Sequence, residues 1–310
     1  MRLISIVTAC YNEEENVEEL YRQVKNIFAG LPEYAYEHIF IDNCSRDRTV
    51  EILKKIAAKD KNVKIIVNTR NFGPVRSPHH ALLQAKGDAA ISIVADLQDP
   101  PSMIRDFIKK WEEGYMRVVG VKRRSEESAI MFQLRRLYYY IINRLSDSEQ
   151  IQNSTGFGLY DKRIVEILKT IQDPYPYFRG LMSEIGFEAA TIEYDQPARK
   201  RGKTKHGFYS LYDIAMLGFT NHSKVPLRLA AMIGFALAVL NFLVGLGYFI
   251  YKLLFWSRFD VGIAPVVIGV FFFASVQLFF IGIIGEYIGS IHTQVLKRPL
   301  VVEKERINFD

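Results

Sequence analysis

Residues 89–101 read AAISIVADLQDPP, and this stretch decides the fold. Its first part, Ala89–Val94, is apolar except for one serine, which is typical of a strand buried on both faces of a parallel sheet. Acidic and amide side chains follow at once, at Asp96, Gln98 and Asp99. Ligands of open parallel sheets bind beyond the carboxyl ends of the strands, so these residues are the first candidates for a functional site.

The same pattern of strand and helix continues on both sides of this stretch. Short apolar runs predict strands at Leu3–Ala9, His38–Asp42, Val63–Val67, Ala89–Val94 and Arg117–Lys122. Helical spacing predicts helices at Glu14–Phe28, Thr49–Ala58, Pro78–Ala85, Pro101–Glu113 and Lys162–Ile171. The alternation predicts an α/β fold of the Rossmann-like kind, with a mostly parallel sheet covered by helices on both faces.

The composition points to a membrane protein as well as a soluble core. Of 310 residues, 49% are hydrophobic, yet 24% are charged, so the apolar residues are concentrated in part of the chain. Leu229–Tyr251 and Val261–Gly285 contain no charged residue and are 23 and 25 residues long. At about 1.5 Å per residue each can cross a hydrocarbon layer about 30 Å thick. The alternative, a pair of buried core helices, is less consistent with two such runs in succession.

Charge around these segments predicts their orientation. The link between them is short, so they form a hairpin with both ends on one side. Basic residues flank the outer ends (Lys224, Arg228, Lys297, Arg298, Lys304 and Arg306), which predicts that both termini and the α/β domain are cytoplasmic. We expect no secretory signal, because acidic residues follow the first apolar run directly. The predicted localisation is the plasma or inner membrane, as a multi-pass protein.

The chain divides into four parts on this basis. Residues 1–206 form the α/β domain, and 207–227 read as an interfacial helix that lies on the bilayer. Residues 228–288 hold the two spans, and 289–310 form a cytoplasmic tail. The segment between the domain and the membrane is strongly basic, with five cations in seven residues: Arg199, Lys200, Arg201, Lys203 and Lys205. These cations suit phosphate contacts or simple attachment to anionic lipid, and both interpretations remain open for the first three.

Several common sites are absent from the sequence. Neither G-x-G-x-x-G nor the P-loop motif occurs, which excludes the usual dinucleotide and P-loop sites. Two cysteines exclude a disulfide scaffold. His79 and His80 are adjacent on a predicted helix and cannot face one metal, so surface exposure or sugar contact is the better hypothesis for them.

A set of motifs, in order along nearly the whole chain, resembles a known family. They are Tyr11-Asn12-Glu13-Glu14, Ile41–Thr49, Arg70-Asn71-Phe72-Gly73, Ala95–Pro101, Arg199-x-x-Gly202-x-Thr204-Lys205, Ile284–Gly289 and Arg298-Pro299. The chain resembles glycosyltransferase family 2, which has the GT-A fold. More closely, it resembles the membrane-anchored polyprenyl-phosphate glycosyltransferases of the GtrB and dolichol-phosphate mannose synthase type. The Q-x-x-R-W motif of processive members is missing, which favours transfer of a single sugar.

The resemblance implies an activity and a set of roles. The activity is inverting transfer of one sugar from a UDP-sugar to polyprenyl (undecaprenyl) phosphate at the membrane. Nucleotide-sugar contacts are expected at Ala9, Tyr11, Glu13, Asp42, Asn71, Ala95, Asp96 and Arg124. Catalytic roles fall to Asp96, Gln98, Arg123 and Lys205, and acceptor-phosphate contacts to Arg123, Arg199 and Lys205. Asp96 would also bind Mg²⁺ or Mn²⁺. The expected partners are these two substrates, membrane lipid and further copies of the chain, up to a tetramer, and no nucleic acid.

The chain also departs from the family pattern. Three acidic positions of the family are Asn43, Val94 and Gly156 here. These changes leave the general base and the strictness of metal dependence open. They also motivate an alternative, a catalytically weakened homologue that binds nucleotide-sugar or lipid as a regulator. A flippase of lipid-linked sugar is a second alternative, but two spans without an ionisable residue inside them are few for that.

Overall fold

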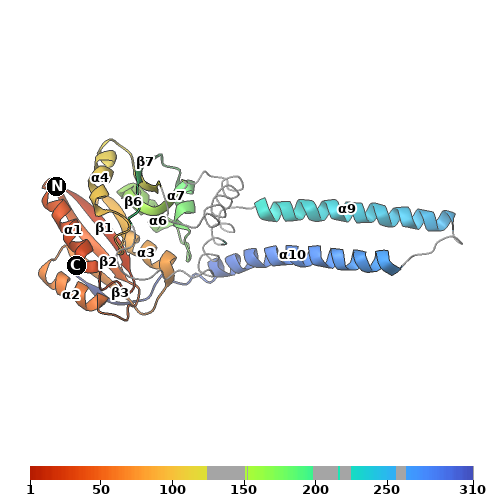
Figure 1. Cartoon of the computed structure of the whole chain (residues 1–310), viewed down its shortest axis with the longest axis horizontal. Coiled ribbons are helices and arrows are strands. Elements are labelled where there is room, and N and C mark those ends of the chain that lie inside the picture. Colours follow the sequence, from red (N-terminus) through yellow and green to blue (C-terminus); the bar gives the residue numbers. More distant parts are fainter. Residues whose placement is uncertain (124–150, 152, 198–215, 217–224, 256–262, 310) are drawn as a thin grey trace.

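The computed structural model describes residues 1–123, 151, 153–197, 216, 225–255 and 263–309. Figure 1 shows an α/β part from which two long antiparallel helices project side by side. The interfacial helix predicted at 207–227 lies outside these residues except for Met216 and the start of the first long helix.

One eight-stranded sheet organises the α/β part. Its order is β7-β5-β6-β4-β1-β2-β3-β8. The strands are β1 (Arg2–Cys10), β2 (Tyr34–Asp42), β3 (Val63–Asn68), β4 (Ala89–Val94), β5 (Arg117–Lys122), β6 (Ser154–Asp161), β7 (Ala189–Tyr194) and β8 (Glu303–Ile307). β6 and β8 run antiparallel to their neighbours, and the other pairs are parallel. The mostly parallel sheet of the GT-A fold is therefore present.

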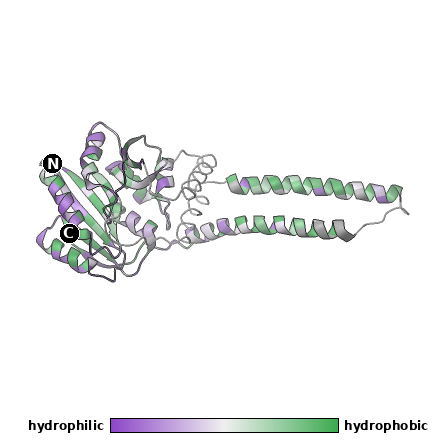
Figure 2. Cartoon of the chain, viewed as in Figure 1, coloured by the Kyte–Doolittle hydropathy of each residue, from purple (hydrophilic) through white to green (hydrophobic). Residues whose placement is uncertain are grey.

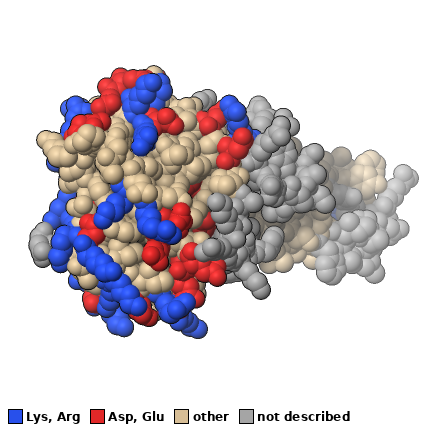
Figure 3. Space-filling view, turned by 60° about the vertical axis from the view of Figure 1, so that its left-hand side comes forward, with Lys and Arg blue, Asp and Glu red and all other residues tan. Residues whose placement is uncertain are grey.

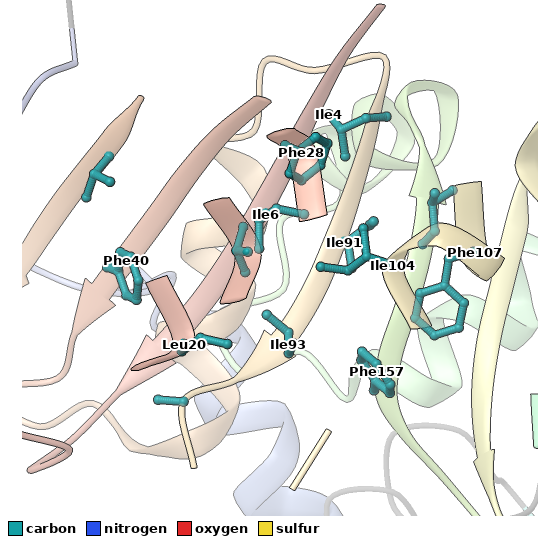
Figure 4. Close-up of a cluster of buried hydrophobic side chains, with 14 of the residues drawn as sticks. Ile4, Ile6, Leu20, Phe28, Phe40, Ile91, Ile93, Ile104, Phe107 and Phe157 are labelled. Carbon is teal, nitrogen blue, oxygen red and sulfur yellow. The ribbon is translucent and has the colours of Figure 1, made fainter. Parts of the chain in front are cut away.

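Helices cover both faces of this sheet. They are α1 (Val17–Ala29), α2 (Thr49–Lys59), α3 (Gly73–Leu83), α4 (Ile104–Glu112), α6 (Lys162–Thr170) and α7 (Phe178–Ile185), with a short 3₁₀ turn at Pro101–Met103. Residues of α1, α2 and α4 pack with one set of strand residues, and α3, α6 and α7 pack with the other. Figure 4 shows the first cluster, in which Ile6, Ile91 and Phe107 are fully buried. Successive side chains of a strand point to opposite faces of the sheet. The apolar side chains on each face are buried by the helices that pack there.

Helix α3 begins five residues earlier than the sequence predicts. Its start was expected at Pro78, because proline favours the first turn of a helix. Instead Pro74 occupies the first turn and Pro78 lies inside the helix. The earlier start places Arg76 on the helix, where it faces the C-terminal segment of the chain.

The two long helices are α9 (Val225–Leu254) and α10 (Ile263–Val295). Helix α9 contains the whole predicted span Leu229–Tyr251, and α10 contains Ile263–Gly285 of the second span and continues to Val295, whereas residues 261 and 262 lie outside the described residues. Leu227–Leu254 and Phe272–Val295 are long and apolar enough to cross a membrane, with mean hydropathies of 2.3 and 1.6. Their apolar side chains point outward; Phe235, for example, is 73% exposed, and Figure 2 shows the helices largely hydrophobic along their length. Surfaces of this kind are stable against lipid rather than water.

The C-terminal tail returns to the α/β part after α10. Its strand β8 adds to the edge of β3, with Ile65 opposite Ile307. The sequence EKERI predicts no strand, because four of its five residues are charged. An edge strand can carry such charges, since one side of it faces solvent.

Candidate functional site

The carboxyl ends of the parallel strands bring most of the predicted site residues to one edge of the sheet. Ala9 lies opposite Ile41 on one side and Val94 on the other. Cys10 is paired with Asp42. Tyr11, Asp42 and Ala95 therefore stand at the ends of three adjacent strands, as the sequence predicts for nucleotide-sugar contacts.

Two loops at this edge are joined by hydrogen bonds. Asn12, with a φ of 53°, donates its backbone N–H to Oγ of Ser45 at 2.8 Å and accepts from the N–H of Arg46 at 2.8 Å. The N–H of Glu13 donates to Thr49 Oγ1 at 2.9 Å. The loop after β1 is thus held against the start of α2, which fixes where Tyr11 and Glu13 lie.

Asp42 is fully buried beneath these loops. Its Oδ2 accepts from the N–H of Ser45 at 2.9 Å, and its Oδ1 accepts from the hydroxyl of Ser45. Burial raises the pKa of Asp42, against the opposing effect of the Ser45 hydrogen bonds. Its carboxylate stabilises the loop after β2, and contact with a nucleotide stays a prediction.

An amide network supports the loop after β3. Nδ2 of Asn43 donates to Oδ1 of Asn71 at 2.9 Å and to the carbonyl of Gly73 at 3.1 Å. Oδ1 of Asn43 accepts from Asn68 at 3.2 Å and from the N–H of Phe72 at 2.8 Å. Asn71 is thus engaged through its side-chain oxygen, in addition to the nucleotide contact predicted for it.

The loop after β4 carries the predicted catalytic residues. Oδ1 of Asp96 accepts from the N–H of Gln98 at 3.2 Å, and Leu97 between them has a φ of 60°. Both Asp96 and Gln98 are partly exposed at this edge. Val94, which replaces an acid of the family, is 43% exposed. An apolar side chain is therefore left open to solvent at the position where the family has a carboxylate.

Asp99, the third candidate that follows Ala89–Val94, is buried behind this loop. It is 2% exposed, and burial raises its pKa to about 6. Its Oδ1 accepts from the hydroxyl of Tyr194 at 3.0 Å, and Lys122 and Asp96 are close enough to shift its pKa in opposite directions. Tyr194 ends β7 and was not predicted, because no motif marks it.

The predicted phosphate-binding cations are only partly described. Nε of Arg123 lies 2.6 Å from Oε2 of Glu193, and both side chains are mostly exposed, at 61% and 57%. An exposed ion pair of this kind contributes little to stability, so Arg123 can exchange Glu193 for another anion. Arg124, Arg199 and Lys205 lie outside the described residues.

The described residues contain no group of three or more His, Cys, Asp or Glu side chains that could hold a metal. Asp96 nevertheless suits a divalent cation whose remaining ligands are donor phosphates and water, because Mg²⁺ often takes only one or two carboxylates. Asp99 is buried and bonded to Tyr194, so it is less free to act as a ligand.

Gly156 adopts a conformation that suits glycine. Its φ is 91°, and a Cβ added there would lie 3.5 Å from the ring of Phe178. Its carbonyl accepts from the hydroxyl of Tyr160 at 2.9 Å. The backbone conformation at this position therefore favours glycine, where the resemblance to the family implies an aspartate.

A hollow of about 890 Å³ opens at the amino ends of β1 and β4, away from the candidate site. Residues such as Arg2, Trp111 and Asp161 line it. Nε1 of Trp111 donates to Asp161 at 2.8 Å in this hollow, and the guanidinium of Arg2 lies over the Trp111 ring at 5.1 Å. The hollow lies away from the strand ends that carry the predicted site. We therefore place the candidate site at the carboxyl ends of the parallel strands.

The neighbourhood of His79 and His80 differs from the hypothesis of surface exposure. His79 is 4% exposed, next to Phe178. Nε2 of His80 lies 2.5 Å from Oε1 of Glu303 in β8. His79 therefore packs in the core and His80 holds the returning tail.

Comparison with known proteins agrees with the motifs. Residues 5–168 match the family described as Glycosyl transferase family 2. The chain is 33% identical to the uncharacterized glycosyltransferase YkcC of Bacillus subtilis, over 99% of this chain and 94% of that protein. It is 32% identical to the SfII prophage-derived bactoprenol glucosyl transferase of Shigella flexneri, over 97% of each. The solved mannosyltransferase PcManGT from Pyrobaculum calidifontis, in complex with GDP-Man and Mn²⁺, has a TM-score of 0.45 at 14% identity, over 96% of this chain and 86% of that one.

Proposed function

The chain belongs to glycosyltransferase family 2, and from that premise we propose that it transfers one sugar from a UDP-sugar to polyprenyl phosphate at the cytoplasmic face of a membrane. The observation that carries the proposal is the near full-length similarity to a bactoprenol glucosyl transferase. In a bacterium the carrier would be undecaprenyl phosphate. The sugar itself stays open among glucose, N-acetylglucosamine and galactose.

The position of the strand-end site supports a lipid acceptor. Helix α3, which follows the loop after β3, contacts the segment leaving α10, since Nη2 of Arg76 donates to the carbonyl of Pro299 at 2.5 Å. Nε2 of Gln294, near the end of α10, donates to Asp173 at 2.8 Å. These contacts fix the α/β part directly to a helix of membrane-spanning length. A lipid phosphate at the bilayer surface is then within reach of this part of the molecule.

The reaction joins two anionic reactants. An oxygen of the lipid phosphate forms a bond to the anomeric carbon, while the bond from that carbon to UDP breaks and its electrons leave with UDP. In-line attack opposite the leaving group gives inversion. A phosphate monoester is mostly a dianion at neutral pH, since its second pKa is near 6. The acceptor therefore needs little help from a base, which makes Gly156 compatible with this reaction.

Positive charge and orientation are the main requirements of such a reaction. Arg123, whose pairing with Glu193 is exposed, can turn toward an incoming phosphate. Arg124, Arg199 and Lys205 are proposed to contact the donor or acceptor phosphates as well. Lys205→Ala should impair use of the acceptor more than binding of UDP.

Asp96 is proposed to hold Mg²⁺ or Mn²⁺ together with the donor diphosphate. When bound, such a cation stabilises the negative charge that develops on the leaving UDP. Gln98, whose N–H is fixed by Asp96 at 3.2 Å, would lie beside the transferred sugar. Tyr11, Glu13 and Asp42 are proposed to position the uracil and ribose.

The decisive experiment measures sugar transfer by the full-length protein in detergent. Radiolabelled UDP-glucose, UDP-N-acetylglucosamine and UDP-galactose are each incubated with undecaprenyl phosphate, and label is counted in the organic phase. Asp96→Asn keeps an oxygen that can accept from Gln98 but removes the charge. We expect it to lower the rate about 100-fold or more. The matched control Asp106→Asn, an exposed position on α4, should retain wild-type rates, and EDTA should abolish transfer until Mg²⁺ or Mn²⁺ is restored.

A catalytically weakened homologue is the second candidate. Exposed Val94 and the glycine conformation at Gly156 favour it, because both replace acids of the family. This candidate predicts that UDP-sugars raise the melting temperature, as any ligand of the native state does, while no donor gives transfer. Transfer that depends on Asp96 would exclude it.

A further inference from the structure

Two arginines contact the buried ring of Phe72, and a third arginine, from the C-terminal part of the chain, lies near one of them. Cζ of Arg70 lies 4.1 Å from the centre of this ring, and Cζ of Arg76 lies 5.1 Å from it. Because both Cζ atoms lie this close to the same ring, the guanidinium groups of Arg70 and Arg76 lie near each other. Arg298 adjoins Pro299, whose carbonyl accepts from Nη2 of Arg76. We call Arg70, Arg76 and Arg298 the arginine cluster.

No carboxylate balances this charge among the residues that the structure describes. None of the three arginines forms an ion pair there, and Nε of Arg76 is buried without a hydrogen-bond partner. Burial, Arg70 and Arg298 together lower the pKa of Arg76. A nearby acid, Glu303, is already bound by His80 and Arg306.

Elsewhere on the α/β part, several arginines are paired with acids. On the face of the α/β part seen in Figure 3, basic and acidic side chains lie side by side. Arg22 and Arg48, for example, pair with Glu19 and Glu14 at 2.6 and 3.0 Å. Like charges held together without a counterion destabilise a fold, so such a cluster suits a bound anion.

The place of the cluster indicates the source of that anion. Helix α10 ends at Val295, and Arg298 follows three residues later. Figure 1 shows that end of α10 beside α3, where the long helices meet the α/β part. Cations at the cytoplasmic end of a membrane-spanning helix are attracted to phosphate groups of anionic lipids, and guanidinium groups bind phosphate through paired hydrogen bonds.

We propose that the arginine cluster binds the phosphate group of a membrane lipid at the bilayer surface. The ligand is either an anionic phospholipid or the phosphate of a polyprenyl chain, since both present the same group. The cluster thereby holds the loop after β3 and the end of α10 in one arrangement around the lipid. The proposal does not depend on the donor or on the sugar, and its test measures binding rather than transfer.

The test uses the full-length protein in a neutral detergent. Binding of dioctanoyl-phosphatidylglycerol, of a short polyprenyl monophosphate and of inorganic phosphate is titrated for wild type and for Arg70→Gln/Arg298→Gln. The side chains of Arg70 and Arg298 are exposed. Neither forms a hydrogen bond or ion pair with another helix or strand of the described chain, so the double variant should fold. Arg22→Gln/Arg105→Gln removes the same charge from α1 and α4 and serves as the control.

We expect the double variant to weaken binding of at least one lipid about tenfold, while the control stays within about twofold of wild type. Loss confined to polyprenyl monophosphate would identify the carrier as the ligand, and loss of phosphatidylglycerol binding would identify a phospholipid. Unchanged lipid binding in the double variant would overturn the proposal. Binding of inorganic phosphate as tight as that of either lipid would also overturn it, since the site would then be one for free phosphate.

A charge-reversed variant separates lipid binding from simple stabilisation. Arg298→Glu places a carboxylate beside Arg76 and should pair with it. We expect lipid binding to fall about as far as in the double variant, without a lower melting temperature. Retained lipid binding in Arg298→Glu would contradict the proposed site.

Discussion

The hydroxyl of Tyr194 donates a 3.0 Å hydrogen bond to Oδ1 of Asp99, where β7 and β4 end on the same edge of the sheet. The second oxygen, Oδ2, accepts from the N–H of Val94 at 3.4 Å. The hydrogen bond from Tyr194 thus ties the loop that carries Asp96 to β7, the edge strand that lies three places from β4 in the sheet order. Burial dominates the electrostatics of Asp99 and raises its pKa to about 6, although Tyr194 and Lys122 act in the other direction.

Asp99→Asn should change how stability depends on pH. The folded state binds the proton of Asp99 more tightly than the unfolded state, whose carboxyl has a pKa near 4. Asp99 therefore contributes most stability below about pH 4, and that contribution is lost as pH rises through about 6. Relative to wild type, the variant should gain about 2–3 kcal/mol in free energy of unfolding between pH 4 and pH 7. Thermal unfolding at several pH values checks this, with Asp106→Asn as the exposed control; parallel curves for Asp99→Asn and wild type would contradict it.

Asn43→Asp should be destabilising even though it restores an acid of the family. Nδ2 of Asn43 donates to Asn71 and to the carbonyl of Gly73, at 2.9 and 3.1 Å. A carboxylate oxygen in its place would face two acceptors in a site that is 6% exposed. The unmade hydrogen bonds and the buried charge should cost about 2–4 kcal/mol at pH 7. The melting temperature measures the effect.

The control for this change is Asn26→Asp, on the exposed face of α1. It introduces the same charge without removing a described hydrogen bond, so its melting temperature should stay close to that of wild type. Asn43→Asp should also regain stability as pH falls, because the protonated acid can donate again. Equal melting temperatures for the two variants at pH 7 would mean that the amide network contributes nothing.

Gly156→Ala should lower stability through the backbone. A φ of 91° is rarely adopted by residues with a Cβ, and the ring of Phe178 stands 3.5 Å from the added atom. The expected loss is about 1–2 kcal/mol. Gly30→Ala is the matched control, because Gly30 has a φ of −95° and its nearest neighbour is the end of the flexible Arg105 side chain. A similar melting temperature for the two alanine variants would contradict the role of the conformation.

The sequence predicts five of the inner strands of the sheet, but it predicts neither the inner strand β6 nor the two edge strands. Ala89–Val94 and Arg117–Lys122 are predicted to the residue, because strands covered on both faces consist mainly of apolar residues. Ala189–Tyr194 and Glu303–Ile307 lie at the two edges of the sheet and are only partly buried. Because these strands are partly exposed, they contain polar residues. The apolar run that marks a central strand is therefore missing from their sequence.

The candidate site divides in a similar way. The positions of Asp42 and Asp96 could be predicted, because Asp42 ends a buried strand and Asp96 comes two residues after one. The bond from Tyr194 to Asp99 could not, since it depends on which strands lie beside one another and joins residues 95 positions apart. The same holds for His80, whose partner Glu303 lies beyond the two long apolar helices in the sequence.

Removal of residues 303–310 should destabilise the α/β part rather than only shorten a tail. Strand β8 covers the edge of β3, and Nζ of Lys54 lies 2.6 Å from Oε2 of Glu305 across this contact. Deletion would expose the backbone groups of β3 and the side chain of Ile65, and an uncovered edge promotes association of chains. We expect the melting temperature to fall by about 5 °C or more and the purified protein to aggregate. Lys304→Gln, an exposed change within the same strand, should leave both measurements unaltered, and a truncated protein that remains monodisperse with the wild-type melting temperature would show that the strand is dispensable.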